Sequence, residues 1–401
     1  MSNSENSQKM TLRIWLALFV LALSTFNIVT TELAPIGLLT PMANALATSE
    51  SYVGMTVSLY AWVGALSALV ASVFLGGVGK KNLLIALSIV LVVSNGLAAS
   101  AETFENLMLA RVIGAVAHGA FWSIIGVSAA SIVPSNYIGL ATSIVFGGVS
   151  VASVFGVPIS NYIGMHIGWR SAFMVMSGLS VLSLVGIASL VPQISEKSSV
   201  GIAAIKAVFK SSSLIKVYFA TILTISAHFT AFTYIEPMLN SLTHISEEFV
   251  PVLLLVFGVA GIVGNVITAL FIDKHLKTIA VLSVLFAASM LILIGEFHVQ
   301  WYQAHIGTAL AIWGATASCI FVALQTWVLR LASEQAFPAS ALYVAFFNLA
   351  IGIGAFLGAW LVASYNVSFL YIFAGVAMAL SLVFITIVPM ESENVQRTQE
   401  A

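Results

Sequence analysis

Long apolar runs alternate with short polar segments along the whole chain. An α-helix needs about 20 consecutive apolar residues to cross the hydrocarbon core of a bilayer, and most of these runs reach or exceed that length. They predict twelve membrane helices, which we expect at 14–39, 52–75, 83–100, 107–133, 137–164, 169–191, 214–240, 249–272, 277–295, 304–329, 339–363 and 367–389.

A more polar segment, 193–213, divides these spans into two sets of six. We therefore predict an all-α integral membrane protein built from two pseudo-symmetric six-helix bundles. The expected domains are 1–192, which includes a short N-terminus, and 214–390, joined by a linker at 193–213 and followed by a tail at 391–401.

Positive charge fixes the expected orientation, because loops rich in Lys and Arg stay in the cytoplasm. If the spans alternate in direction, only Arg111 and Arg170 fall elsewhere, and the other cations share one side. These are Lys9, Arg13, Lys80, Lys81, Lys197, Lys206, Lys210, Lys216, Lys274, Lys277, Arg330 and Arg397. Both termini and the linker are therefore predicted to be cytoplasmic.

Composition agrees and excludes several functions. Hydrophobic residues make up 60% of the chain and charged residues 7%, against about 25% charged residues in soluble domains. A net charge of −1 leaves no basic surface for nucleic acid. The sequence contains neither a P-loop nor a His–Glu–x–x–His metal motif, so we expect no cofactor, no metal and no enzymatic activity. Gly352 to Gly358 lacks the spacing of a dinucleotide loop and predicts close helix packing instead.

Three strongly ionised side chains lie well inside the predicted spans: Glu32, Arg111 and Glu236. A charge at this depth costs about 3 kcal/mol or more, so such residues usually face the protein interior. Arg111 and His118 are seven residues apart, which places them on one helix face. Because the proton affinity of a carboxylate depends on burial and on neighbouring charge, and His titrates near neutral pH, we predict proton coupling by Glu32, Arg111 and His118. The alternative is an arginine that reaches the membrane surface and a histidine that serves a helix contact.

Glu32 and Glu236 occupy equivalent spans of the two halves, and each is followed closely by a proline, Pro35 or Pro237. Matching features in matching spans indicate a transporter built from repeats, with its site between the halves. This pattern also favours alternating access over a channel. Glu236 could bind substrate or shape the outer gate, and both glutamates could instead be interfacial.

Polar and aromatic side chains near the middle of the spans fit a neutral, hydroxylated solute, because amides bind hydroxyl groups and flat rings cover the apolar face of a sugar. Each could also be an interfacial aromatic or an interhelical hydrogen bond. The predicted substrate-binding residues are Asn27, Trp62, Trp122, His228, Tyr234, Glu236, Trp313, Gln325 and Asn348.

Several stretches carry a family resemblance. They are Phe26 to Leu39, Tyr60–Ala61–Trp62, Arg111 to Trp122, Ala227 to Pro237, Phe347 to Gly358, and Gly148–x7–Gly156–Val157–Pro158. With them the chain resembles the major facilitator superfamily, in particular its twelve-span drug:proton antiporter branch and the SotB-type sugar efflux transporters.

The resemblance implies two bundles that rock around a central cavity, in a monomer of the bacterial inner membrane. Its expected partners are protons, the lipid bilayer and a small sugar or sugar-like solute. Inward flow of protons would drive the export of this solute. A multidrug:proton antiporter of the same superfamily is the alternative.

Overall fold

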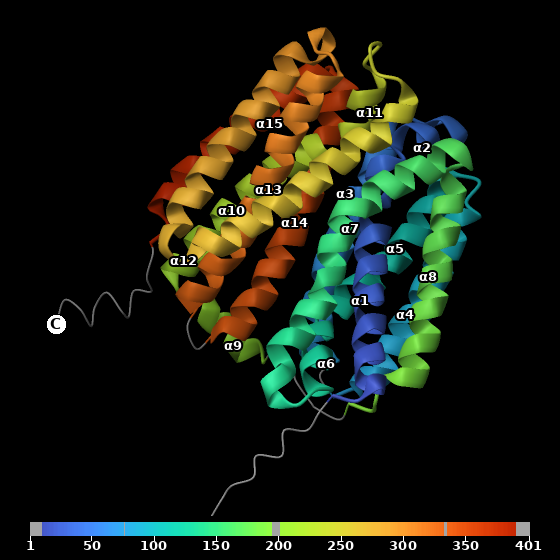
Figure 1. Ribbon diagram of the computed structural model, residues 1–401, viewed down its shortest axis with the longest axis vertical. Helices are drawn as coiled ribbons and strands as arrows, with labels where there is room; N and C mark the ends of the chain where they lie inside the picture. The colour runs from blue at the N-terminus through green and yellow to red at the C-terminus, as the bar shows by residue number, and fades with distance from the viewer. Residues whose placement is uncertain (1–9, 76, 195–200, 333–334, 390–401) are drawn as a thin grey trace, which may run out of the picture.

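The helices run between two ends of the molecule (Figure 1), and we found no strand in the part of the chain that this computed structural model describes, residues 10–75, 77–194, 201–332 and 335–389. The long helices are α1 (Leu12–Leu33), α3 (Glu50–Phe74), α4 (Lys80–Ala99), α5 (Phe104–Trp122), α7 (Ile138–His166), α8 (Trp169–Leu190), α10 (Ser212–Phe232), α12 (Val250–Phe297), α13 (Gln303–Ala332), α14 (Ala336–Ser364) and α15 (Val367–Ile387). The short ones are η1 (Ala34–Gly37), α2 (Leu39–Ala45), α6 (Ile125–Ser131), η2 (Ser135–Tyr137), α9 (Ile202–Val208), α11 (Ile235–Asn240), η3 (Glu247–Phe249) and η4 (His298–Gln300).

These helices account for twelve membrane crossings. Within the described ranges, 10 helices are each long and apolar enough to span a bilayer, and α5 with α6 forms one more span with a bend of 42°. Helix α12 has 48 residues, about twice the length that a bilayer requires. It is interrupted at His275, whose φ of −128° and ψ of 25° are not helical, so it supplies two crossings. The predicted all-α membrane fold with twelve spans is confirmed.

The helices pack in two groups. Helices α1, α3, α4, α5, α7 and α8 contact one another, as do α10, α12, α13, α14 and α15, while α3 with α14 and α7 with α12 make the main contacts between the groups. We propose that each group is one domain, as the sequence indicates. Part of the predicted linker (195–200) and the predicted tail (391–401) lie outside the described residues.

Two ends of the molecule are distinguished below. The "α11 end" holds α2 and α11, at the top of Figure 1, and the "α9 end" is the opposite one. Helix α1 starts at the α9 end, where the Thr11 side chain accepts a hydrogen bond from the Ile14 amide. Helix α3 starts at the α11 end, where Ser49 caps it in the same way.

Glycines allow the helices to approach closely. A Cβ at Gly148 of α7 would collide with the backbone of Ala22 in α1, and one at Gly354 of α14 would collide with Ser226 in α10.

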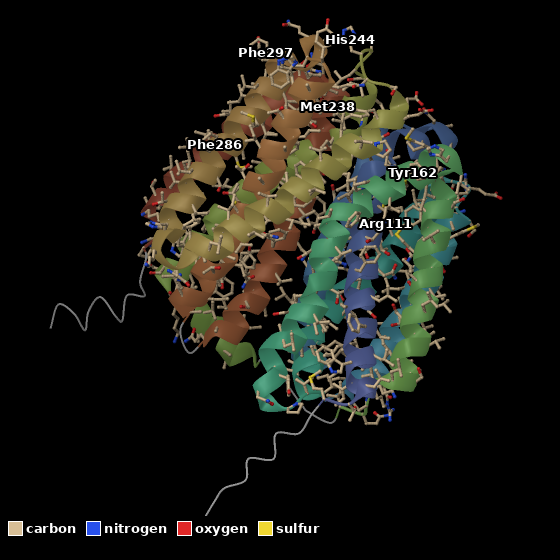
Figure 2. The ribbon with its side chains drawn as sticks, in the orientation of Figure 1. Arg111, Tyr162, Met238, His244, Phe286 and Phe297 are labelled. Atoms are coloured by element: carbon tan, nitrogen blue, oxygen red, sulfur yellow. The ribbon has the colours of Figure 1, made fainter. Side chains whose placement is uncertain are left out.

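Large apolar side chains cover the outside of the molecule, as Phe286 does with 55% of its surface exposed, while Arg111 lies among the helices (Figure 2). This distribution is that of a protein whose solvent is lipid.

Candidate functional site

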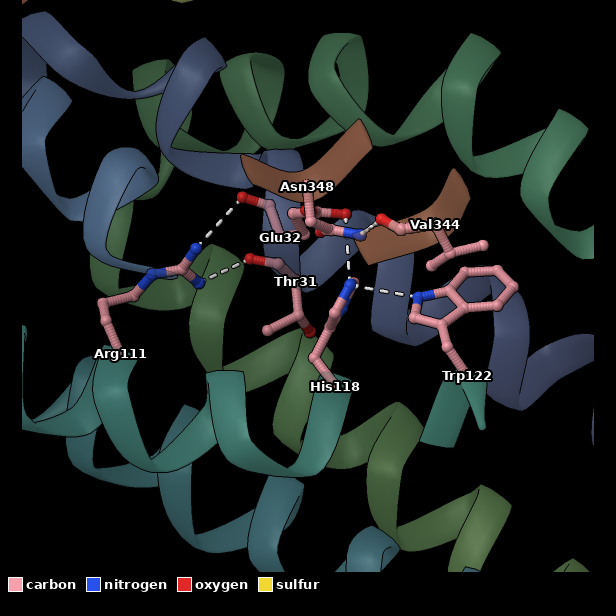
Figure 3. Close-up of polar contacts among 7 residues, drawn as sticks. All are labelled: Thr31, Glu32, Arg111, His118, Trp122, Val344 and Asn348. Carbon is pink, nitrogen blue, oxygen red and sulfur yellow. Dashed lines mark hydrogen bonds and ion pairs between the residues drawn. The ribbon is translucent and has the colours of Figure 1, made fainter. Parts of the chain in front are cut away.

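Arg111 of α5 is 1% exposed and holds the end of α1. Its Nη1 donates to the Thr31 carbonyl at 2.6 Å and its Nη2 to the Glu32 carbonyl at 3.0 Å (Figure 3), while its guanidinium lies 3.9 Å from the centre of the Tyr60 ring. In a regular helix the residue at position 35 would donate to the Thr31 carbonyl, but Pro35 has no N–H. Arg111 therefore supplies the hydrogen bond that the proline removes.

His118 lies two turns further along α5 and is 1% exposed. Its Nε2 accepts a hydrogen bond from Trp122 Nε1 at 3.0 Å and lies 3.6 Å from Glu32 Oε2. Because the Trp122 bond requires a lone pair on Nε2, His118 carries no proton at that atom in this state. Glu32 Oε1 is buried and has no hydrogen-bond partner among the described residues.

A cavity of about 470 Å³ lies beside these groups, between the two bundles. The first bundle contributes Glu32, His118 and Trp122, and α14 of the second contributes Asn348. The Asn348 amide nitrogen donates to the Val344 carbonyl at 2.9 Å, and its oxygen has no partner among the described residues. Gln325, Thr326 and Tyr343 extend the polar part of the wall. The remaining wall is largely apolar and includes Phe146, Phe229, Phe321 and Phe347.

A second cavity of about 220 Å³ adjoins the first, since both are lined by Leu33, Val149, Ser153, Phe229, Phe321 and Val322. His228 lies on its wall, and its ring is in contact with the rings of Phe229, Phe232, Phe257, Trp313 and Phe321. Trp313 is fully buried and packs on His228 without lining either cavity.

The other predicted binding residues line neither cavity. The Asn27 amide donates to Ser180 Oγ at 2.7 Å inside the first bundle. Trp62 packs between α3 and α14, against Gly352 and Phe356. Tyr234 and Glu236 are buried at the α11 end. Of the nine predicted substrate ligands, Trp122, Gln325 and Asn348 line the central cavity and His228 lines its neighbour.

Sequence reasoning missed several groups on the wall. Tyr343, Thr326 and Ser153 line the cavity although none was expected there. Tyr343 is a polar aromatic residue near the start of the predicted span 339–363, so a criterion that favoured the middle of each span did not select it. No group of three or more His, Cys, Asp or Glu residues that could hold a metal occurs in the described part of the chain.

Twelve crossings, a cavity between two bundles and buried ionisable groups beside it define a membrane transporter. A sequence profile of the Major Facilitator Superfamily matches residues 14–340. The chain belongs to this superfamily, which makes it a multi-pass membrane transporter and not an enzyme.

Solved structures share the fold. The human organic anion transporter MFSD10 (TETRAN) is 14% identical, with a TM-score of 0.69 over 94% of this chain and 100% of that one. A D-xylose-proton symporter is 16% identical, with a TM-score of 0.72 over 94% and 98%. A POT family transporter in complex with 5-aminolevulinic acid is 12% identical, with a TM-score of 0.73 over 94% and 96%. At these identities the likeness shows the fold alone.

Proposed function

We propose that this protein exports sugars or sugar-like solutes in exchange for protons, by alternating access. One observation carries the proposal: Glu32 and His118 of the first bundle share a cavity wall with Asn348 of the second. A buried carboxylate beside a buried imidazole can hold and release a proton. Because the cavity is formed by both bundles, a movement of one against the other changes the surroundings of that pair.

His118 couples the proton to the cavity wall. Its Nε2 accepts from Trp122 while it carries no proton, and Glu32 Oε2 lies 3.6 Å away. A proton on Nε2 would end the Trp122 hydrogen bond and replace it with a charge-assisted bond to Glu32. Proton binding would thus release the Trp122 ring, which lines the cavity. Arg111 acts as a positioning residue, because it holds the backbone of Glu32 in place.

The wall suits a compact polyhydroxylated solute. Asn348, Gln325 and Tyr343 can donate and accept hydrogen bonds, and Trp122 offers a flat face for the apolar side of a sugar ring. The likeness to a sugar symporter in fold is compatible with this class of substrate.

The expected membrane, orientation and oligomeric state belong to the same proposal. Cations lie at the starts of α1 and α4, at the break in α12 and near the end of α13, all at the α9 end. The positive-inside rule then makes the α9 end cytoplasmic and the α11 end external. We propose that the protein acts as a monomer in a bacterial inner membrane.

Uptake of a labelled, non-metabolisable galactoside into inside-out vesicles, with and without an imposed pH gradient, tests the proposal. Accumulation that requires the gradient and disappears in Glu32→Gln is expected. Sugar movement that ignores the gradient would indicate facilitated diffusion and refute proton antiport.

A multidrug:proton antiporter is the second candidate, and the apolar aromatic part of the wall favours it. Rings of Phe146, Phe321 and Phe347 would hold a lipophilic cation by stacking and cation–π contact. Uptake of a fluorescent lipophilic cation by the same vesicles, measured in place of sugar uptake, distinguishes the drug exporter from the sugar exporter. Gradient-dependent movement of the cation without movement of sugar would select this candidate.

A further inference from the structure

The two bundles are joined at the α11 end by a buried carboxylate. Glu236, in the first turn of α11, is 1% exposed. Its Oε2 accepts hydrogen bonds from the backbone N–H of Thr40 at 3.0 Å and from the Thr40 hydroxyl at 3.0 Å, and its Oε1 accepts from the Asn240 amide. Thr40 belongs to α2 of the first bundle, so this contact crosses between the bundles.

A second carboxylate meets the same hydroxyl. Glu50 Oε1, at the start of α3, lies 2.8 Å from Thr40 Oγ1. The hydroxyl therefore has a carboxylate oxygen at hydrogen-bond distance on two sides. A hydroxyl has one hydrogen and can donate only once. The second short oxygen–oxygen contact needs another proton, which must be carried by the carboxyl group of Glu50 or of Glu236.

Within the described residues, neither Glu50 nor Glu236 has a recorded cationic partner. The charged group that acts on Glu236 is Glu50 itself. Glu50 also acts on Tyr234, another titratable side chain at this end of the molecule. Its hydroxyl is fully buried against Gly54, one turn along α3 from Glu50, and has no partner among the described residues. Two ionised carboxylates would repel each other here, with no cationic partner among the described residues to offset the repulsion.

We propose that Glu50, Thr40 and Glu236 form a second proton-binding site, which closes the α11 end of the transporter with one bound proton. The proton completes the chain from one carboxyl group through the Thr40 hydroxyl to the other and removes one of two like charges. Separating the bundles breaks the chain and lets both carboxyl groups ionise into water. This site goes beyond the proposed function, because it requires neither a sugar nor Glu32.

The sign of the pH effect follows from linkage. Closure binds one proton at this site, so the closed state gains population as the pH falls on that side of the membrane. One proton changes the ratio of closed to open molecules by about tenfold per pH unit over the range in which the site titrates. In the orientation proposed above, the site senses the external pH.

Distances between spin labels test this proposal without any transport. The labels are placed at cysteines introduced for Ala45 and Thr243, exposed positions on opposite bundles at the α11 end, after Cys319→Ser removes the native thiol. The full-length protein in lipid nanodiscs, without substrate, is measured across a pH series by double electron–electron resonance. The parent is expected to shift towards the short distance as the pH falls.

In Glu50→Gln the amide donates permanently to Thr40, so closure no longer binds a proton at this site. The ratio of closed to open molecules is therefore expected to lose the part of its pH dependence that one proton supplies, about tenfold per pH unit. Thr40→Val, which removes the bridge, is expected to lose the same response and to favour the open state. Thr40→Ser retains the hydroxyl and is expected to behave like the parent. Glu102→Gln, an exposed carboxylate at the same end, is the matched control.

Either of two results would overturn the proposal: a parent whose distances ignore pH, or Glu50→Gln and Thr40→Val proteins whose response is as steep as that of the parent. Should Glu50→Gln fail to fold, the pair Thr40→Val and Thr40→Ser still decides. Should Thr40→Val fail, the pair Glu50→Gln and Glu102→Gln decides. A failure here leaves the sugar uptake experiment untouched, since no solute and no gradient are used.

Discussion

Glu32 and Glu236 occupy matching places in the two bundles, yet their surroundings differ. Glu32 lies in the last turn of α1 and faces the cavity, with His118 of its own bundle 3.6 Å away. Glu236 lies beyond the end of α10, in the first turn of α11, and its Oε2 accepts two hydrogen bonds from Thr40 of the opposite bundle. One carboxylate serves the cavity, whereas the other connects the bundles.

The position of the nearby proline explains part of the difference. Pro35 comes three residues after Glu32, so α1 continues through the glutamate, and the Thr31 carbonyl loses the N–H that would otherwise pair with it. Pro237 directly follows Glu236, and the helix has already broken at Thr233 and Tyr234. A proline in the first turn of α11 is tolerated because that N–H is unpaired in any helix. The repeated sequence feature thus produces two local structures.

The largest expected effect separates these two roles. Glu32→Gln should reduce gradient-driven accumulation in vesicles to the level without a gradient, because the group that exchanges the proton is gone. Glu236→Gln should slow transport but keep the same stimulation by the gradient, since Glu32 and His118 beside the cavity are unchanged. The ratio of uptake with and without the gradient measures the difference.

The matched control for this comparison is Glu105→Gln, an exposed carboxylate that does not line the cavity. It should leave both rates unchanged. Equal loss of stimulation in Glu32→Gln and Glu236→Gln would show that the two glutamates act as one proton pathway, contrary to the division described above.

The second largest effect concerns the end of α1. Arg111→Ala should lower the free energy of unfolding by about 3 kcal/mol, because the buried carbonyls of Thr31 and Glu32 lose their donor. Thermal unfolding in detergent measures this change. The loss should be smaller in a protein that also carries Pro35→Ala, since an alanine at that position restores the N–H that can pair with the Thr31 carbonyl.

A double-mutant cycle over Arg111→Ala and Pro35→Ala provides the control. We expect a coupling of about 1 kcal/mol between the two positions, as for residues that share one hydrogen-bond partner. Strictly additive losses would mean that Arg111 stabilises α1 by some means other than replacing the bond that Pro35 removes.

A smaller effect is expected where the bundles close on Tyr234. A Cβ at Gly54 of α3 would overlap the Tyr234 hydroxyl, and overpacking of this kind costs about 1–3 kcal/mol. Gly54→Ala should therefore favour the open form at the α11 end, seen as a longer distance between labels at positions 45 and 243. Gly139→Ala, where the added Cβ meets nothing, should leave the distance unchanged.

The sequence predicted the fold well, because the length and polarity of each run are local properties that the bilayer selects directly. It also indicated Glu32, Arg111 and His118 as buried ionisable groups, since their burial follows from depth alone. It did not predict that Arg111 would bind backbone carbonyls, nor that Thr40 would connect two glutamates. Those contacts depend on the rotation and height of each helix relative to its neighbours, which no single run of residues encodes.

Asn27 and Asn348 illustrate the same limit. Both are amides near the middle of apolar spans, and both were predicted to bind substrate. In the structure the side chain of Asn27 points into the first bundle and donates to Ser180, whereas the side chain of Asn348 donates to the Val344 carbonyl and lines the cavity. Both amide oxygens have no partner among the described residues, so the cavity is what distinguishes Asn348. Their residue type and depth are alike, and only the direction of the side chain differs.

The smallest expected effect tests that distinction. Asn348→Ala should raise the KM for the transported solute about tenfold, because one hydrogen bond to a bound ligand contributes about 1.4 kcal/mol. Asn27→Ala should leave KM unchanged and lower thermal stability instead, since Ser180 loses a buried partner. Initial rates of uptake at several solute concentrations, together with melting curves for both proteins, separate the two outcomes. A rise in KM for Asn27→Ala without a change at Asn348 would move the binding site into the first bundle and away from the cavity between the two.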